Sequence, residues 1–134
     1  MRRLKHVPQQ RSTDCGVACI CSIAGVGRTF AMKALEVEES ARCHRTSAKQ
    51  MRAALKKLRF RMLREVYCSD WGNLSGSVEL ALLAVNYDEM KNHWHWVVFD
   101  RCDPYKPILD PQSNARRAIH SKTRLYSYYR IERL

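Results

Sequence analysis

The spacing of apolar residues changes near Phe60, and this change limits the folds open to the 134-residue chain. Before Phe60, apolar side chains recur at helical spacing, as in Met51, Leu55 and Leu58. After it, short runs rich in β-branched and aromatic residues are separated by turn residues. A helical part followed by an antiparallel sheet predicts an α+β fold, and the length predicts one domain over residues 1–134.

The part before Phe60 predicts three helices. The first ends at Gly25, and the second spans residues 30–39. The third begins after a cap at Thr46 or Ser47, has apolar positions as far as Met62, and carries a basic outer face.

The part after Phe60 predicts five strands, at residues 61–67, 78–87, 94–100, 106–109 and 124–131. Turn residues separate them at positions 69–73, 86–92, 102–104 and 110–114.

Composition narrows the class of protein. A net charge of +11 and a pI near 9.7 predict an acidic partner. The longest nearly apolar run, Val78 to Val85, is interrupted by Glu79 and is shorter than the roughly 20 residues of a membrane span, so we expect no transmembrane segment. The charged N-terminus is unlike a secretory signal, so we expect reduced cysteines and a cytoplasmic location.

Cys15 lies where the first helix is expected to begin. Asp14 can cap that helix and leave its free amides pointing toward the sulfur, which would favour the thiolate. Gly16 would keep the first turn open to a substrate backbone. Cys19 and Cys21 are interpreted as inert core residues. A nucleophilic Cys15 still needs a base from elsewhere in the chain.

Two histidines in one strand can supply that base. His93 and His95 share a face of the strand, and His95 opens the apolar run that follows. Asp110 comes 15 residues after His95 and follows the short apolar strand that ends at Leu109. A hairpin between the two strands would bring the Asp110 carboxylate to the imidazole and fix its orientation.

Four segments of the chain together resemble one known family. They are Gln9, Asp14-Cys15-Gly16-Val17-Ala18-Cys19, His95-Trp96-Val97-Val98 and Leu109-Asp110-Pro111. In this combination the chain resembles the papain-like cysteine peptidase domain that removes double-glycine leaders, known at the N-terminus of bacteriocin-exporting ABC transporters. The segment from Thr46 to Phe60 also looks like that family's third helix. The resemblance covers nearly the whole chain and implies a papain-like fold with a cysteine peptidase activity.

The resemblance assigns a role to each matching position. Cys15 would be the nucleophile, His95 the general base and later acid, and Asp110 the residue that orients His95. Gln9 would donate its amide to the oxyanion, together with the Cys15 backbone amide, and the family's spacing favours Gln9 over Gln10. It implies a peptide or protein substrate with a leader that can be acidic, and no cofactor.

The chain departs from the family in two respects. The family has Gly where Trp94 precedes the strand histidine, and the transporter domains and any Gly-rich phosphate loop are absent from this sequence. We therefore expect a free-standing enzyme or one that pairs with a separate ABC transporter.

Three alternatives remain open from the sequence. A metal site could use the cysteines and histidines, including Cys43 and His44, but no pair has the C-x2-C spacing of a zinc knuckle. A nucleic-acid binder could use the basic segment of residues 49–64 and the tyrosines near the C-terminus. A papain-like fold could also perform deamidation or acyl transfer with the same triad.

Overall fold

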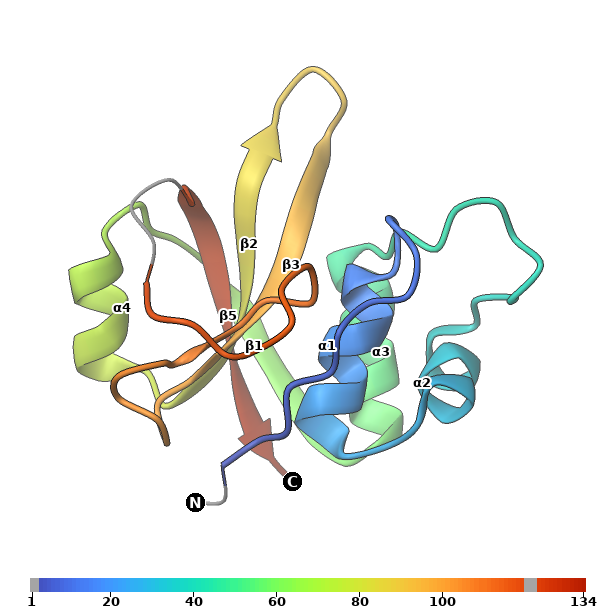
Figure 1. The fold of residues 1–134 in the computed structure, drawn as a ribbon, viewed down its shortest axis with the longest axis horizontal. Helices are drawn as coiled ribbons and strands as arrows, with labels where there is room; N and C mark the ends of the chain where they lie inside the picture. The colour runs from blue at the N-terminus through green and yellow to red at the C-terminus, as the bar shows by residue number, and fades with distance from the viewer. Residues whose placement is uncertain (1–2, 120–122) are drawn as a thin grey trace.

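A helical part and a five-stranded antiparallel sheet lie side by side in the computed structural model, which describes residues 3–119 and 123–134 (Figure 1). Helices α1 (Cys15–Ala24), α2 (Arg28–Leu35) and α3 (Ala48–Lys57) pack together on one face of the sheet. The predicted α+β fold is confirmed.

The strands are β1 (Phe60–Tyr67), β2 (Leu80–Asp88), β3 (His93–Asp100), β4 (Ile108–Leu109) and β5 (Leu125–Arg133). Their order in the sheet is β1-β5-β2-β3-β4, so the last strand of the chain is inserted between β1 and β2. Helix α4 (Trp71–Ser77) covers the face opposite to the other helices. All five predicted strands are present, with ends shifted by a few residues.

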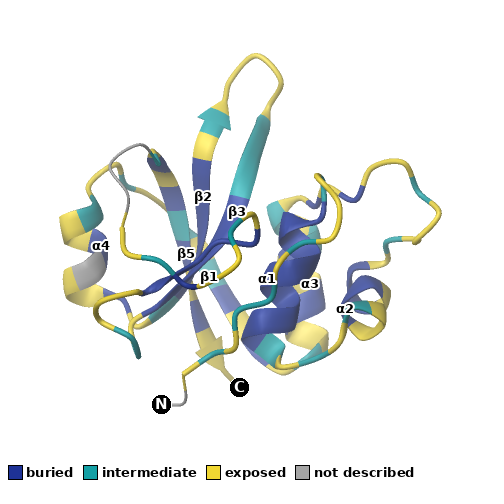
Figure 2. Cartoon of the chain, in the orientation of Figure 1, coloured by how far each residue is buried: buried dark blue, intermediate teal, exposed yellow. Residues whose placement is uncertain are grey.

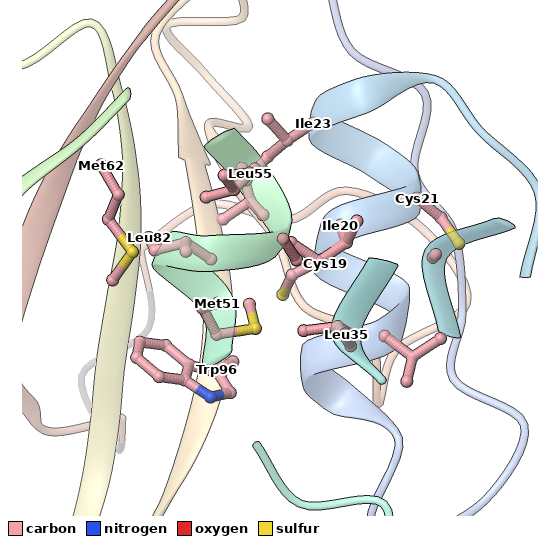
Figure 3. Close-up of a cluster of buried hydrophobic side chains, with 14 of the residues drawn as sticks. Cys19, Ile20, Cys21, Ile23, Leu35, Met51, Leu55, Met62, Leu82 and Trp96 are labelled. Carbon is pink, nitrogen blue, oxygen red and sulfur yellow. The ribbon is translucent and has the colours of Figure 1, made fainter. Parts of the chain in front are cut away.

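Residues of β2 alternate between two cores, as the period of a strand requires. Leu82 faces α1 and α3, where it joins a cluster that includes Trp96, whereas Leu83 faces α4 and Leu74 (Figure 3). Trp96 is 1% exposed, and its Nε1 donates a hydrogen bond to the Thr46 carbonyl at 3.0 Å. A fully buried indole is stable only with such a partner, so this bond ties β3 to the start of α3.

Helix α1 lies in the centre of the protein and is surrounded by α2, α3 and β3 (Figure 2). Every residue from Cys15 to Ile23 is buried, which explains why this helix is apolar on all sides. It ends at Gly25, whose φ of 68° is the left-handed conformation that glycine adopts without strain. Within the described residues, no single helix is long and apolar enough to cross a membrane, although α1 and α2 together reach that length and composition across a 111° bend.

Two predicted helices have different bounds in the structure. The second helix spans α2 and not residues 30–39, because Glu36 adopts a left-handed conformation that ends it. Glu39 lies beyond the helix and forms a 2.9 Å ion pair with Arg28. The third helix begins at a Ser47 capping box with Gln50, which settles the choice between Thr46 and Ser47.

The segment after α3 differs from the prediction at two places. Met62 belongs to β1, in agreement with the predicted strand at residues 61–67, and not to the third helix, because the chain turns at Leu58 and begins a strand at Phe60. Residues 69–73 were predicted to be a turn but lead into α4. Asp70 caps this helix through a 2.8 Å hydrogen bond from the Gly72 amide, and Leu74 anchors it in the second core.

Gly16 sits where α1, α3 and β3 meet. A Cβ atom at this position would overlap Thr46 Oγ1 and lie 3.3 Å from Cδ1 of Trp96. Gly16 therefore allows α1 to approach α3 and β3 closely. The expectation that it leaves space for a substrate backbone is wrong, because its open side faces the core.

Replacing Gly16 with alanine should destabilise the protein, because Thr46 and Trp96 belong to packed elements and cannot move away freely. The expected loss in the free energy of unfolding is about 1–3 kcal/mol, measured by denaturant titration. Gly76→Ala is the matched control, because a Cβ at Gly76 meets no atom within 4 Å. Equal stability of Gly16→Ala and wild type would contradict this account of the packing.

Candidate catalytic site

The hairpin formed by β3 and β4 brings a histidine and a carboxylate together. Val98 pairs with Leu109, and Asp110 follows directly after β4. Nε2 of His95 lies 2.6 Å from Oδ1 of Asp110, which is the contact that the sequence predicted from a hairpin. His93 is one of the residues at the mouth of the same site, two positions earlier on β3.

The Asp110 carboxylate is held by more than His95. Nη2 of Arg117 lies 2.6 Å from Oδ2, and the Gln112 amide donates a hydrogen bond to Oδ1 at 3.0 Å. Burial opposes the charge, but the hydrogen bonds from His95, Arg117 and Gln112 outweigh it and hold the pKa of Asp110 well below its usual value. Asp110 is therefore ionised in the folded protein.

Sequence reasoning missed Arg117. It reaches Asp110 because its backbone forms a β-bridge with Ile108, which places the two segments side by side. Nothing in the sequence distinguishes Arg117 from the other basic residues of this segment.

His95 connects the carboxylate to a thiol. Its Nε2 faces Asp110, which leaves Nδ1 for Cys15. Burial alone would lower the pKa of His95, but the hydrogen bonds with Asp110 and Cys15 raise it to about 9. The imidazole is therefore protonated at neutral pH, which makes it a source of positive charge beside the sulfur.

Cys15 is the first residue of α1, at the end where backbone amides have no helical partner. Cys15 is 7% exposed, and its Sγ accepts a hydrogen bond from the Trp96 amide at 3.4 Å. The helix end and the protonated His95 both place positive charge beside the sulfur. A cavity of about 370 Å³ opens at Cys15 and is lined by His93, Trp94 and Trp96, among others. A peptide could reach the sulfur through it.

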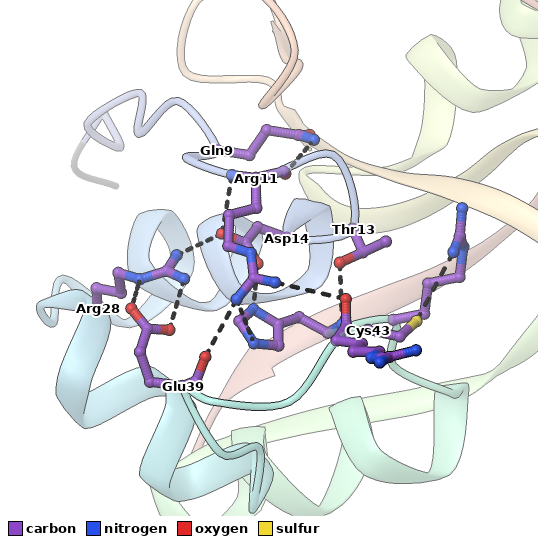
Figure 4. A network of polar contacts seen from close by, with 10 residues as sticks. Gln9, Arg11, Thr13, Asp14, Arg28, Glu39 and Cys43 are labelled. Atoms are coloured by element: carbon purple, nitrogen blue, oxygen red, sulfur yellow. Dashed lines mark hydrogen bonds and ion pairs between the residues drawn. The ribbon is translucent and has the colours of Figure 1, made fainter.

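Asp14 occupies the N-cap position of α1, but its side chain does not cap the helix, contrary to the prediction. Its carboxylate makes no hydrogen bond to the amides of the helix. Instead, Oδ2 lies 2.6 Å from Arg28 Nη1 and accepts the Arg11 amide at 3.0 Å, while Oδ1 lies 2.6 Å from His44 Nδ1 (Figure 4). Burial raises the pKa of Asp14, but the hydrogen bonds from Arg28 and His44 outweigh it and lower the pKa below its usual value. These cationic and polar partners compensate the charge next to Cys15.

His44 is completely buried in this network. Nη1 of Arg11 lies 3.2 Å from its Nε2, and because a guanidinium can only donate, Nε2 is the acceptor. Nδ1 therefore donates its proton to Asp14, so His44 holds that carboxylate in place. Its neighbour Cys43 is exposed, so the two side chains do not act as a pair.

Gln9 lies beside the loop that carries the carboxylate. Its backbone amide donates to the Pro111 carbonyl at 2.8 Å, directly after Asp110. Its side-chain Nε2 donates to the Arg11 carbonyl at 2.8 Å, while Oε1 is buried and has no partner among the described residues. One Nε2 hydrogen is thus used within the protein, and the second is left for another acceptor. Gln10 is exposed.

The remaining cysteines near the site are inert. Cys19 and Cys21 are buried in α1, and burial raises the pKa of each thiol, as expected for core residues. Cys15, Cys19 and Cys21 are not joined by disulfides.

Comparison with known proteins places this arrangement in context. The model of the Peptidase C39 family matches residues 3–130. A search of curated proteins found no match. One similar solved structure is a double glycine motif protease from an AMS/PCAT transporter in complex with its leader peptide, with a TM-score of 0.70 and 13% identity over 98% of this chain and 92% of that chain. Another is the peptidase domain of Streptococcus ComA, a bifunctional ABC transporter involved in quorum sensing, with a TM-score of 0.59 and 18% identity over 97% of this chain and 98% of that chain.

The His95 ring should stay protonated until the pH reaches about 9. Removing the carboxylate charge with Asp110→Asn should lower the pKa of His95, because one of the groups that stabilise the imidazolium is lost. Nitrogen-detected NMR titration of the ring measures this directly. Asp88→Asn, an exposed change on β2, is the control and should leave the titration unchanged.

The raised pKa of His95 also determines whether the protein gains or loses stability as the pH rises. The folded pKa of His95 lies above its ordinary value of 6.5, so its contribution to stability is complete below pH 6.5 and is lost as the pH rises to about 9. Asp110→Asn should weaken this dependence between pH 6.5 and 9. An unchanged His95 titration in Asp110→Asn would contradict the electrostatic account of the pair.

Proposed function

Because the chain belongs to the Peptidase C39 family and is therefore a cysteine peptidase, we propose that it cleaves the peptide bond after a double-glycine leader in a precursor peptide. The observation that carries this proposal is the 2.6 Å contact between His95 and Asp110 on the hairpin beside Cys15. A thiol at a helix end, an imidazolium and an ionised carboxylate are the parts that a thiol peptidase needs.

Each residue takes one role in the proposed reaction. The Cys15 thiolate attacks the scissile carbonyl carbon, and the imidazolium of His95 gives its proton to the departing amine, so that an acyl-enzyme forms on the sulfur. His95 then takes a proton from water, which attacks the thioester and releases the leader. Asp110 stays ionised throughout, because Arg117 and Gln112 hold its charge, and it orients His95.

The oxyanion of each tetrahedral intermediate needs hydrogen-bond donors close to the sulfur. The Cys15 amide is one candidate, since it is the first amide of α1 and has no helical acceptor. The second hydrogen of Gln9 Nε2 is the other. The bond to Arg11 orients this amide before the substrate arrives, which suits a donor that acts on the transition state.

The cavity at Cys15 suits small residues next to the sulfur. Trp94 and Trp96 form part of its wall, and the indoles lie edge to face with centroids 5.5 Å apart. Glycines, which carry no side chain, can approach the sulfur beside this aromatic wall. We propose that the rest of the leader lies on the basic surface outside, where the net charge of +11 attracts acidic residues. A separate ABC transporter at the cytoplasmic face of a membrane would export the product.

Incubation of the purified protein with double-glycine precursor peptides, followed by mass spectrometry, tests the function. Wild type and the control Cys43→Ala should cut after the second glycine, whereas Cys15→Ala should not. Cys43 is exposed, so its replacement leaves the core intact. Cleavage by Cys15→Ala would refute the nucleophile, and deamidation without cleavage would place the chemistry in another class.

His95 and His93 should differ strongly in their effect on turnover. His95→Ala removes the group that transfers protons and should lower kcat/KM by roughly 10⁴-fold. His93→Ala should change it by less than about tenfold, because His93 lines the cavity but does not contact Asp110. Steady-state kinetics on a fluorogenic precursor peptide measures both, and the reverse ranking would show that the histidines are misassigned.

Gln9→Ala should lower kcat by roughly 10²–10³, the range for the loss of one oxyanion donor, with KM nearly unchanged. The carboxylate of Gln9→Glu would repel the oxyanion and should be at least as damaging. Gln10→Ala is the matched control, since Gln10 is exposed and adjacent. If Gln10→Ala were the impaired variant and Gln9→Ala were normal, the oxyanion site would lie one residue later.

A further inference from the structure

A second cavity lies at the other end of α1 from Cys15. It has a volume of about 920 Å³ and is formed by the N-terminal segment, the end of α1, the loops on either side of β4 and the end of β5. Its charged lining residues are all basic: Arg3, Lys5, Lys106, Arg116 and Arg133. No carboxylate of residues 3–119 and 123–134 lines it, although the whole chain contains 13 Asp and Glu residues. The cavity is therefore a local concentration of positive charge that the proposed peptidase reaction does not use.

Arg116 is the buried residue of this set, with a side chain that is 5% exposed. Its Nη2 donates to the Asp100 carboxylate, which also accepts the Leu4 amide. Its Nε and Nη1 are buried and have no hydrogen-bond partner among the described residues. A guanidinium whose N–H groups are buried without acceptors is costly in free energy, and an anionic oxygen in the adjoining cavity would supply those acceptors.

The charges around the cavity do not cancel. Arg116 is paired with Asp100, and Arg3 is paired with Asp103 at 3.1 Å. Lys5 and Lys106 form no ion pair within residues 3–119 and 123–134, and Arg133 stacks only on the Phe60 ring. The C-terminal end of α1 adds a partial negative charge of about half a unit, which opposes an anion. Three cations without acidic partners outweigh it.

We propose that this cavity binds an anion with two or more phosphate groups. A single carboxylate carries one charge and would leave most of the surrounding cations unmatched, whereas a diphosphate carries several charges on adjacent groups. Arginine and lysine are the residues that bind phosphate oxygens, through directed N–H groups and point charge respectively. The volume of about 920 Å³ is also in the range of pockets that hold whole small molecules, so the phosphates can be free or belong to a nucleotide.

The NMR signals of His6 can report the binding of an anion in this cavity. It lines the cavity, and its Nε2 lies 2.9 Å from the carbonyl oxygen of Asp110, so the ring donates to that carbonyl. An anion that enters the cavity changes the field at this ring. The NMR signals of His6 should therefore shift on binding, whereas those of His93, which lies at the other cavity, should not.

Isothermal titration calorimetry of the full chain with inorganic diphosphate, at constant ionic strength, tests the proposal. We expect saturable binding with one site per chain. The double variant Lys5→Ala, Lys106→Ala should weaken binding by about tenfold or more, because it removes two charge-assisted contacts from exposed positions without disturbing the core. Lys91→Ala in the turn between β2 and β3 removes a charge outside the cavity and should change the dissociation constant by less than about twofold.

Arg116→Lys tests the buried guanidinium. It keeps the positive charge near Asp100 but lacks the unpartnered Nε and Nη1 donors, so binding should weaken while the protein stays folded. Tighter binding of ADP or ATP than of diphosphate would identify a nucleotide as the source of the phosphates, and equal binding would identify free phosphates. Absence of saturable diphosphate binding, or equal loss of affinity in the Lys91→Ala control and the Lys5, Lys106 double variant, would overturn the proposal.

Discussion

The close contact between α1 and β3 is the constraint on which the rest of the structure depends. Gly16 lets the first turn of α1 lie against Thr46 and Trp96, and the Trp96 indole fixes the same junction by donating to the Thr46 carbonyl at 3.0 Å. A larger residue would push the helix away from the strand. Because Cys15 precedes Gly16 and His95 precedes Trp96, this contact also sets how the sulfur meets the imidazole.

Charge is arranged differently on the two sides of Cys15. On one side, the Asp14 carboxylate forms an ion pair with Arg28 and accepts a hydrogen bond from His44, so it is directed into a buried network and away from the helix amides. On the other side, His95 stays protonated because Asp110 remains ionised. The first arrangement holds the start of α1 in place, and the second leaves a positive charge for the sulfur. Both depend on segments that are far apart in the sequence.

The sequence predicted the features that local patterns determine. A strand that carries His95, followed by a turn and a short strand before Asp110, was enough to predict their contact. It could not predict that Asp14 would bind distant partners in place of the helix amides, because a local cap and a long-range ion pair look the same in sequence. Helix α4 was missed because its glycines and serines favour a turn, whereas burial of Leu74 against the sheet decides the outcome. Arg117 was missed because a β-bridge sets its position.

The central claim is that Cys15, His95 and Asp110 act as one chemical unit, and the rate of alkylation at each cysteine tests it most directly. Cys43 is the reference with which the alkylation rate of Cys15 is compared. It is a demanding reference, because Cys43 is exposed and a hydrogen bond from the Arg45 backbone lowers the pKa of its thiol. The account predicts that iodoacetamide at pH 7 labels Cys15 faster than Cys43 in wild type, and that His95→Ala reverses the order. Faster labelling of Cys43 in wild type, with the rate at Cys15 unchanged by His95→Ala, would contradict it.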